Sequence, residues 1–311
     1  MFFDPIVYFF IIGIISSVWG ASLHLPKAMY DTISLYLLIA IGLKGGYELA
    51  HWMSTTVIMQ SIAVILLGLA CISIALFILK LLTKHPHRDV IVIAAHYGSV
   101  SVGTYAVATS IVNSAGILYE PYMPLFVALL EFPAIIVAAL LLEYGEQEKH
   151  SIFEPLIASL KSKSIFALIT SIVIGLLMGQ HGANSIAPLF FDLFKGVLAF
   201  FLLQMGTIVG KKLPEIKKHL KEIIFTSIIL CLAGAILGLF FAKLIGLSQG
   251  GCILLMTLAA SASYIAVPAS LEASYPNDNI PLALTYSLGA TLPFNILIGI
   301  NLYVWLSGFF Y

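Results

Sequence analysis

Residues 101–136 read SVGTYAVATSIVNSAGILYEPYMPLFVALLEFPAII, and residues 261–296 read SASYIAVPASLEASYPNDNIPLALTYSLGATLPFNI. The two stretches align at one constant offset of 160 residues, and eight of the thirty-six pairs are identical. Two scarce prolines fall in register, since Pro121 aligns with Pro281 and Pro133 with Pro293. The chain therefore contains an internal repeat, which in a hydrophobic protein is typical of transporters built from two related halves.

The composition indicates an integral membrane protein. Of the 311 residues, 60% are hydrophobic and only 10% are charged, whereas the surface of a soluble domain needs about 25–35% charged residues. Met1 leads directly into an apolar stretch in which Asp4 is the only charge, so we expect a retained helix rather than a cleaved signal peptide. Lipid is the expected surrounding, and no nucleic-acid partner is expected.

The apolar stretches predict an all-α fold of ten transmembrane helices, five in each half. Each stretch is close to the ~20 residues that cross the hydrocarbon region. The predicted spans are 5–22, 30–50, 55–80, 91–114, 121–144, 164–180, 188–209, 222–245, 251–274 and 281–308.

The positive charges predict the orientation of these helices. Twelve of the fifteen Lys and Arg residues lie in connections that follow odd-numbered helices, which the positive-inside rule places in the cytoplasm. Both termini would then lie on the periplasmic side of a bacterial inner membrane. Because five is odd, residues 164–311 would cross the membrane in the opposite sense to residues 1–145, giving two inverted repeats joined by a cytoplasmic linker at 146–163.

Helices four and nine differ from ordinary spans because each carries small hydroxyl residues and a helix breaker near mid-membrane. Freed backbone groups at that depth are tolerated only inside the protein or around a wet cavity. An interrupted helix presents unpaired N–H groups and a partial positive charge, which suit a small anion. Serines and glycines also permit close helix packing, which is the alternative interpretation. The predicted anion-binding residues are Gly98, Ser99, Ser101, Gly103, Thr104, Ser261, Ala262, Ser263 and Tyr264.

Glu131 is the one carboxylate well inside a hydrophobic span. A buried acid is costly unless it is paired or protonated, so Glu131 is a candidate functional residue. Together with Ser101 and Ser263 it would coordinate Na⁺ as a coupling ion; otherwise it would carry a proton, or cap the kink at Pro133. Lys44 is a candidate ion-pair partner for coupling, although a lysine near a helix end also commonly reaches toward the interface.

Four motifs make the chain similar to the sodium-dependent bicarbonate transporter family of the SbtA type. The resemblance implies ten helices in two inverted repeats, bicarbonate and Na⁺ at the broken helices, and no further cofactor. It also implies a homotrimer and, in cyanobacterial members, a PII-like regulatory protein on the cytoplasmic face. The chain departs from the family at two places. Glu131 stands where the family has an aspartate, and Ser261-Ala262-Ser263-Tyr264 stands where the family has Ser-Ser-Ser-Asp. The motifs are Gly42-Leu-Lys-Gly-Gly46, Gly98-Ser-Val-Ser101, Glu131-Phe-Pro-Ala134 and Ala259-Ala-Ser-Ala-Ser263.

These observations predict a secondary active transporter that imports bicarbonate, or a similar small monovalent anion, with Na⁺ by alternating access. The sequence has no Gly-x-x-x-x-Gly-Lys-[Ser/Thr] loop for ATP, and no His-Glu-x-x-His motif or paired aspartates of an intramembrane enzyme. One alternative keeps the fold and makes Glu131 the proton carrier of an H⁺-coupled anion carrier or a cation/proton exchanger. The other alternative is an anion sensor that binds but does not transport.

Overall fold

The computed structural model describes residues 4–311 except 22, 144–156, 158–159, 162, 217–219 and 276, and the described residues form helices but no strands. The predicted linker at 146–163 thus lies largely outside the described residues. The helices are α1 (Pro5–Trp19), α2 (Lys27–Trp52), α3 (Thr55–Leu82), α4 (His87–Gly98), α5 (Val102–Ser114), α6 (Met123–Glu143), α8 (Lys163–Leu177), α9 (Gly179–Ala187), α10 (Phe194–Ile216), α11 (Leu220–Leu244), α12 (Gln249–Ala259), α13 (Ala266–Ser274), α14 (Ile280–Tyr286), α15 (Leu292–Phe294) and α16 (Ile300–Ser307). There are also three π-helical turns. The first, η1 (Pro188–Asp192), continues α9, while η2 (Ser287–Thr291) and η3 (Asn295–Gly299) link α14 to α16 through α15.

Each of the ten predicted spans coincides with one helix or one run of helices. Within the described residues, seven of these are long and apolar enough to cross a membrane. The other three spans are the interrupted pair α12–α13 and the first helix of each half, α1 and α8, each of which has 15 residues and is about 22 Å long at 1.5 Å per residue. That is less than the ~30 Å hydrocarbon thickness, so these two helices would require flanking residues or a thinner bilayer. Ten crossings therefore remain a prediction.

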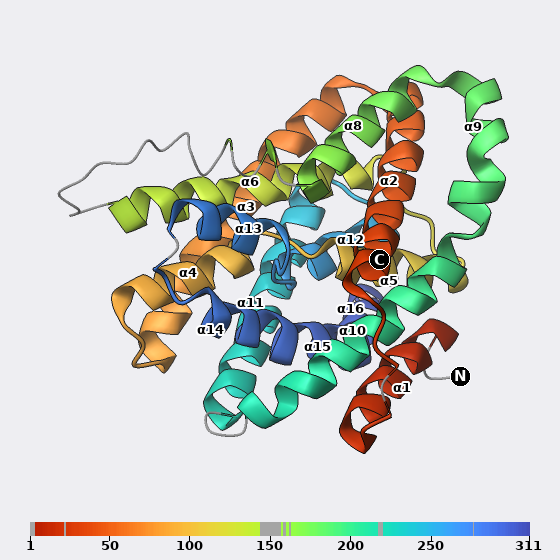
Figure 1. The fold of residues 1–311 in the computed structure, drawn as a ribbon. Helices are drawn as coiled ribbons and strands as arrows, with labels where there is room; N and C mark the ends of the chain where they lie inside the picture. Colours follow the sequence, from red (N-terminus) through yellow and green to blue (C-terminus); the bar gives the residue numbers. More distant parts are fainter. Residues whose placement is uncertain are drawn as a thin grey trace.

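The first of two groups of helices consists of α1, α2, α8 and α10, and we call it the paired-helix bundle. In this bundle α1 packs along α10, and α2 packs along α8 (Figure 1). Glycine allows the close approach: a Cβ at Gly13 would lie 2.2 Å from the Leu203 carbonyl oxygen, and one at Gly175 would lie 2.4 Å from that of Leu43. Leu43 and Leu203 are 160 residues apart, so the two helix pairs repeat the same contact.

Helix α9 lies beside α2 and α8, and helices α3–α6 and α11–α16 form the second group, which we call the broken-helix bundle. Here α3 packs against α4 and α6, α11 packs against α12, and α3 and α11 contact each other. Helices of both predicted halves thus lie in each bundle. The packing follows the sequence repeat, which supports two related halves that are interleaved rather than separate.

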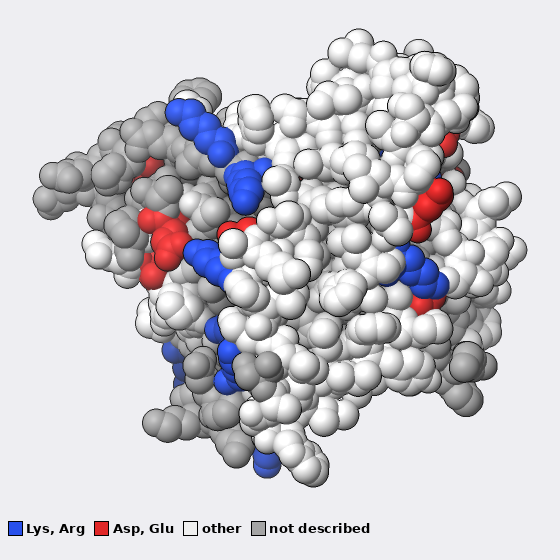
Figure 2. Space-filling view, turned by 45° about the vertical axis from the view of Figure 1, so that its right-hand side comes forward, with Lys and Arg blue, Asp and Glu red and all other residues white. Residues whose placement is uncertain are grey.

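On the face drawn in Figure 2, the charged side chains of Lys, Arg, Asp and Glu gather at two opposite sides, with a wide uncharged area between them. Large apolar side chains such as Phe77, Phe166 and Phe225 are exposed. An exposed apolar belt between two charged rims is the surface that a lipid bilayer covers.

Candidate functional site

The first interruption lies between α4, which ends at Gly98, and α5, which begins at Val102. Gly98 is required for packing, because a Cβ there would lie 2.5 Å from the Cβ of Ile72. Ser101 restarts the helix: its Oγ accepts a 3.1 Å hydrogen bond from the Thr104 N–H and a 2.8 Å bond from the Thr104 hydroxyl. A serine in this position is a favoured N-cap, so the local sequence explains the break.

The second interruption separates α12, which ends at Ala259, from α13, which begins at Ala266. The Ser263 Oγ accepts a 3.3 Å hydrogen bond from the Val267 N–H in the first turn of α13. Pro268 lies in the same turn, where the missing N–H of a proline costs little. Both helices that the sequence predicts to be broken are therefore interrupted.

The two interruptions are in direct contact. The Ser101 N–H donates a 2.9 Å hydrogen bond to the Oγ of Ser261, its counterpart in the repeat. The Ser263 N–H donates a 2.8 Å bond to the His96 carbonyl oxygen. These bonds satisfy part of the backbone that the breaks release, as buried peptide groups require, and they hold the two breaks side by side.

A small cavity lies where the interruptions face the paired-helix bundle, and we call it the inner cavity. It leaves about 30 Å³ for the centres of water-sized molecules, and one water requires about 10–15 Å³ on that scale. The space therefore suits a ligand of a few non-hydrogen atoms. Its lining residues are Val100, Ser101, Val102, Gly103, Ala106 and Glu131, together with Ser263, Tyr264, Ile265 and Ala266 from the second break, Ser34, Leu37 and Leu38 from α2, and Phe201 from α10.

Two hydroxyl groups in this lining lack good hydrogen bonds. Among the described residues, the buried Ser34 Oγ and Tyr264 OH make no hydrogen bond of good geometry, although Tyr30 lies near Ser34 and Ser101 lies near Tyr264. Buried polar atoms are nearly always hydrogen-bonded in folded proteins, and leaving one unpaired costs about 1–3 kcal/mol. Because both residues line the inner cavity, a polar ligand or water in the cavity would satisfy them.

Helix N-termini add positive potential to the same cavity. Val102 and Gly103 begin α5 and Ala266 begins α13, and all three residues line the cavity. The first N–H groups of a helix have no partner within the helix, and the helix dipole makes that end partly positive. Two such ends at one cavity favour a bound anion.

Glu131 is the acidic residue in the lining. Its side chain is buried, and its Oε2 accepts a 2.5 Å hydrogen bond from the Ser99 hydroxyl. The predicted Na⁺ ligands Glu131, Ser101 and Ser263 all line the inner cavity. Carboxylate and hydroxyl oxygens are ligands that suit a hard cation rather than a transition metal.

The other predicted residues lie behind this lining. Ser99 bonds to Glu131, Thr104 and Ser261 bond to Ser101, and Ala262 is buried. They shape the interruptions instead of facing the cavity.

Lys44 lies elsewhere. It is exposed on α2 and lines a second, larger cavity that does not include Glu131. The pairing of Lys44 with Glu131 that the sequence suggested is not what the structure shows.

Several lining residues were not predicted from the sequence, among them Ser34 and Phe201. These two come from α2 and α10, far along the chain from either interruption. A single serine and a single phenylalanine in apolar spans carry no motif, and their place at the site depends on how the two bundles pack.

Comparison with known protein families gives one match. The sequence model of the family described as the Na⁺-dependent bicarbonate transporter superfamily matches residues 5–308. A search among curated proteins finds no significant match.

Proposed function

The chain belongs to the Na⁺-dependent bicarbonate transporter superfamily, and from this we propose that it imports bicarbonate, or a similar small monovalent anion, together with Na⁺. The protein is a secondary active transporter rather than an enzyme in this proposal. It would be a multi-pass protein of the bacterial inner membrane with both termini on the periplasmic side. The homotrimer and the PII-like regulatory partner rest on the family resemblance alone.

The main support for this proposal is the inner cavity. It combines two helix N-termini with the hydroxyls of Ser34 and Tyr264, which lack good hydrogen bonds. Hydroxyl and N–H donors can hold a monovalent oxyanion, whereas a multivalent anion would call for an arginine clamp. The anion would lie against Ser101–Gly103 and Ser263–Tyr264, with Na⁺ at Glu131 and the neighbouring hydroxyl oxygens.

The walls of the cavity support alternating access. Ser34 and Phe201 belong to the paired-helix bundle, whereas the two interruptions and Glu131 belong to the broken-helix bundle. A ligand at this boundary contacts both bundles, so a movement of one bundle against the other would open the site to either side. Inverted halves would supply two related states for this exchange.

Uptake into proteoliposomes tests the proposal. We expect labelled bicarbonate to accumulate when Na⁺ is higher outside than inside, and not when Na⁺ is equal on both sides. A pH gradient that drives full uptake without Na⁺ would contradict Na⁺ coupling. Thermal stabilisation by bicarbonate without any uptake would instead identify a sensor.

Proton coupling is the second candidate. A buried carboxyl group can carry a proton, because its charged form is costly without a compensating cation; Glu131 is buried, and Ser99 donates a hydrogen bond to it. Measuring uptake against pH at constant membrane potential and fixed Na⁺ separates the two candidates, because a proton-coupled carrier responds to the pH gradient itself.

A further inference from the structure

A second cavity lies between the same two bundles, and we call it the outer cavity. It leaves about 520 Å³ for the centres of water-sized molecules, so it is far larger than the inner cavity. Residues of α2, α5, the segment 117–124, η1 and α10 line it. It is a vestibule with room for hydrated ions.

The two cavities are neighbours along the same helices. On α5, Ala106 lines the inner cavity and Thr109 lines the outer one; on α2, Leu38 lines the inner cavity and Ile41 the outer one. Three residues advance a helix by about 4.5 Å. The walls of the two cavities therefore come within about one helical turn of each other.

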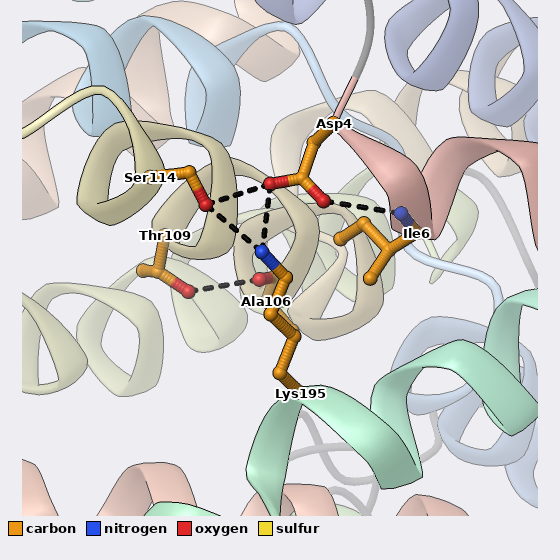
Figure 3. Close-up of polar contacts among 6 residues, drawn as sticks. All are labelled: Asp4, Ile6, Ala106, Thr109, Ser114 and Lys195. Atoms are coloured by element: carbon orange, nitrogen blue, oxygen red, sulfur yellow. Dashed lines mark hydrogen bonds and ion pairs between the residues drawn. The ribbon is translucent and has the colours of Figure 1, made fainter.

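Most polar groups of the outer cavity are already paired. The Lys195 Nζ lies 3.0 Å from the Asp4 Oδ2 and 2.9 Å from the Ser114 Oγ, and the Ser114 hydroxyl donates a 2.7 Å bond to Asp4 (Figure 3). The Thr109 hydroxyl donates a 2.9 Å bond to the Ala106 carbonyl oxygen. The charge of Lys195 is thus neutralised by Asp4.

Lys44 and Ser110 are different. Ser110 is 7% exposed and its Oγ has no hydrogen-bond partner among the described residues. Lys44 is exposed and makes no ion pair with any described residue. A free ammonium group and an unsatisfied hydroxyl donor in one cavity are the groups that bind a small anion.

We propose that the outer cavity is a second anion-binding site, in which Lys44 and Ser110 hold a small inorganic monoanion before it reaches the inner cavity. The identity of that anion and the direction of its movement rest on the proposed function. Glu48 also lines the outer cavity, four residues from Lys44, and its negative charge weakens the site. Weak binding suits a passage, because an ion must leave each site as well as occupy it.

Cysteine modification tests this site without requiring transport. Asn113→Cys places a thiol in the outer cavity, and the three native cysteines are buried. We would measure its reaction rates with an anionic sulfonatoethyl and a cationic trimethylammonium-ethyl methanethiosulfonate in purified protein. We expect Lys44→Met to lower the anionic-to-cationic rate ratio about threefold to tenfold and Glu48→Gln to raise it.

Protection by the anion completes the experiment. Sodium bicarbonate should slow modification relative to sodium gluconate at equal ionic strength, and Ser110→Ala should weaken the protection. Lys221→Met, at an exposed lysine of α11, is the matched control and should change neither result. An unchanged rate ratio in Lys44→Met, or no protection by bicarbonate, would overturn the proposal.

The outcome is separate from that of the proposed function. Protection without uptake by the native protein would leave the second site standing and remove the transporter. Uptake by the native protein without protection by bicarbonate would support the transporter and remove the second anion-binding site. Gel filtration and thermal unfolding of each variant exclude a loss of folding as the cause.

Discussion

Glu131 and Thr291 are 160 residues apart and occupy the same place in the two halves, but their contacts differ. Glu131 accepts a bond from Ser99 and lines the inner cavity. The Thr291 Oγ1 instead lies 2.6 Å from the hydroxyl of Tyr97, which also donates a 3.0 Å bond to Ser227. The first-half acid therefore faces the ligand space, whereas its second-half counterpart is bound within the broken-helix bundle.

The backbone of the two interruptions differs in the same way. The Asn295 side-chain amide donates a 2.9 Å hydrogen bond to the Ala260 carbonyl oxygen and accepts a 2.9 Å bond from Tyr303. The first half has Ile135 in the place of Asn295, and Val100, the counterpart of Ala260, lines the inner cavity. The second interruption therefore has a side-chain bond to its backbone carbonyl that the first lacks, although residues of both line the inner cavity.

Separate variants at Glu131 and Thr291 should differ most in Na⁺-dependent uptake. Glu131→Gln removes the negative charge that would attract the cation, so we expect Na⁺-dependent uptake to fall by at least about tenfold, given that hydrogen bonds to charged groups are worth about 1.5–3 kcal/mol. Thr291→Val keeps the shape and removes a bond distant from the cavity, so uptake per folded protein should change little. Equal losses in both variants would contradict the comparison.

Position 103 provides the next contrast. A Cβ at Gly103 would lie 2.2 Å from the Tyr264 hydroxyl and 2.8 Å from a ring carbon of Phe201, whereas its counterpart Ser263 carries a side chain. Gly103→Ala should therefore shrink the inner cavity and weaken bicarbonate binding about tenfold, since overpacking costs about 1–3 kcal/mol.

Bicarbonate-dependent thermal stabilisation would measure this loss. The matched control is Gly196→Ala on α10, where an added Cβ meets nothing within 4 Å. Unchanged binding in Gly103→Ala would show that the inner cavity does not hold the anion.

The sequence predicts more of the interruptions than of the cavity around them. Glycine, serine and proline disfavour continuous helix locally, so the breaks near Ser101 and Ser263 could be predicted without tertiary information. Ser101 and Ser261 hold equivalent repeat positions, but their contact depends on how the two halves pack. The family resemblance is confirmed by the match over residues 5–308.

The positions of Ser34 and Lys44 could not be predicted in this way. Both lie on α2, and which cavity each one lines depends on the rotation of α2 against α8 and the broken-helix bundle. That rotation is set by helix packing through close glycine contacts, such as Gly46 against the backbone of Ile172. Hydrophobic periodicity carries little information here, because a membrane helix is apolar on its lipid-facing side as well.

Asn295→Ala tests whether the second interruption is a structural support. Losing its bond leaves the buried Ala260 carbonyl oxygen unpaired, which should lower the free energy of unfolding by about 1–3 kcal/mol. Thermal unfolding in detergent would show the loss, and Asn301→Ala on α16, which is only half-buried, should show less. Uptake per folded molecule should persist; an abolished uptake in stable protein would place Asn295 in the transport site instead.

The smallest expected effect comes from Asp4, which precedes α1 and contacts Ser114 at the end of α5 and Lys195 on α10. Partial burial alone would raise the pKa of Asp4, but hydrogen bonds from the Ile6 N–H, Ser114 and Lys195 and the charge of Lys195 outweigh it, so the pKa is lowered. A lowered pKa stabilises the folded state above the usual aspartate value of about 4, and that stabilisation is lost as the pH falls through the lowered value.

Asp4→Asn keeps a good N-cap and removes only the charge, so it should lower the free energy of unfolding by about 0.5 kcal/mol near neutral pH and not at all in strong acid. A separate ion pair joins the two halves, since Arg88 donates bonds of 2.8 and 3.2 Å to the two carboxylate oxygens of Asp278, and it does not involve Asp4. Its contribution should remain in Asp4→Asn, and a pH-independent difference between the native protein and this variant would show that the Asp4 charge stabilises nothing.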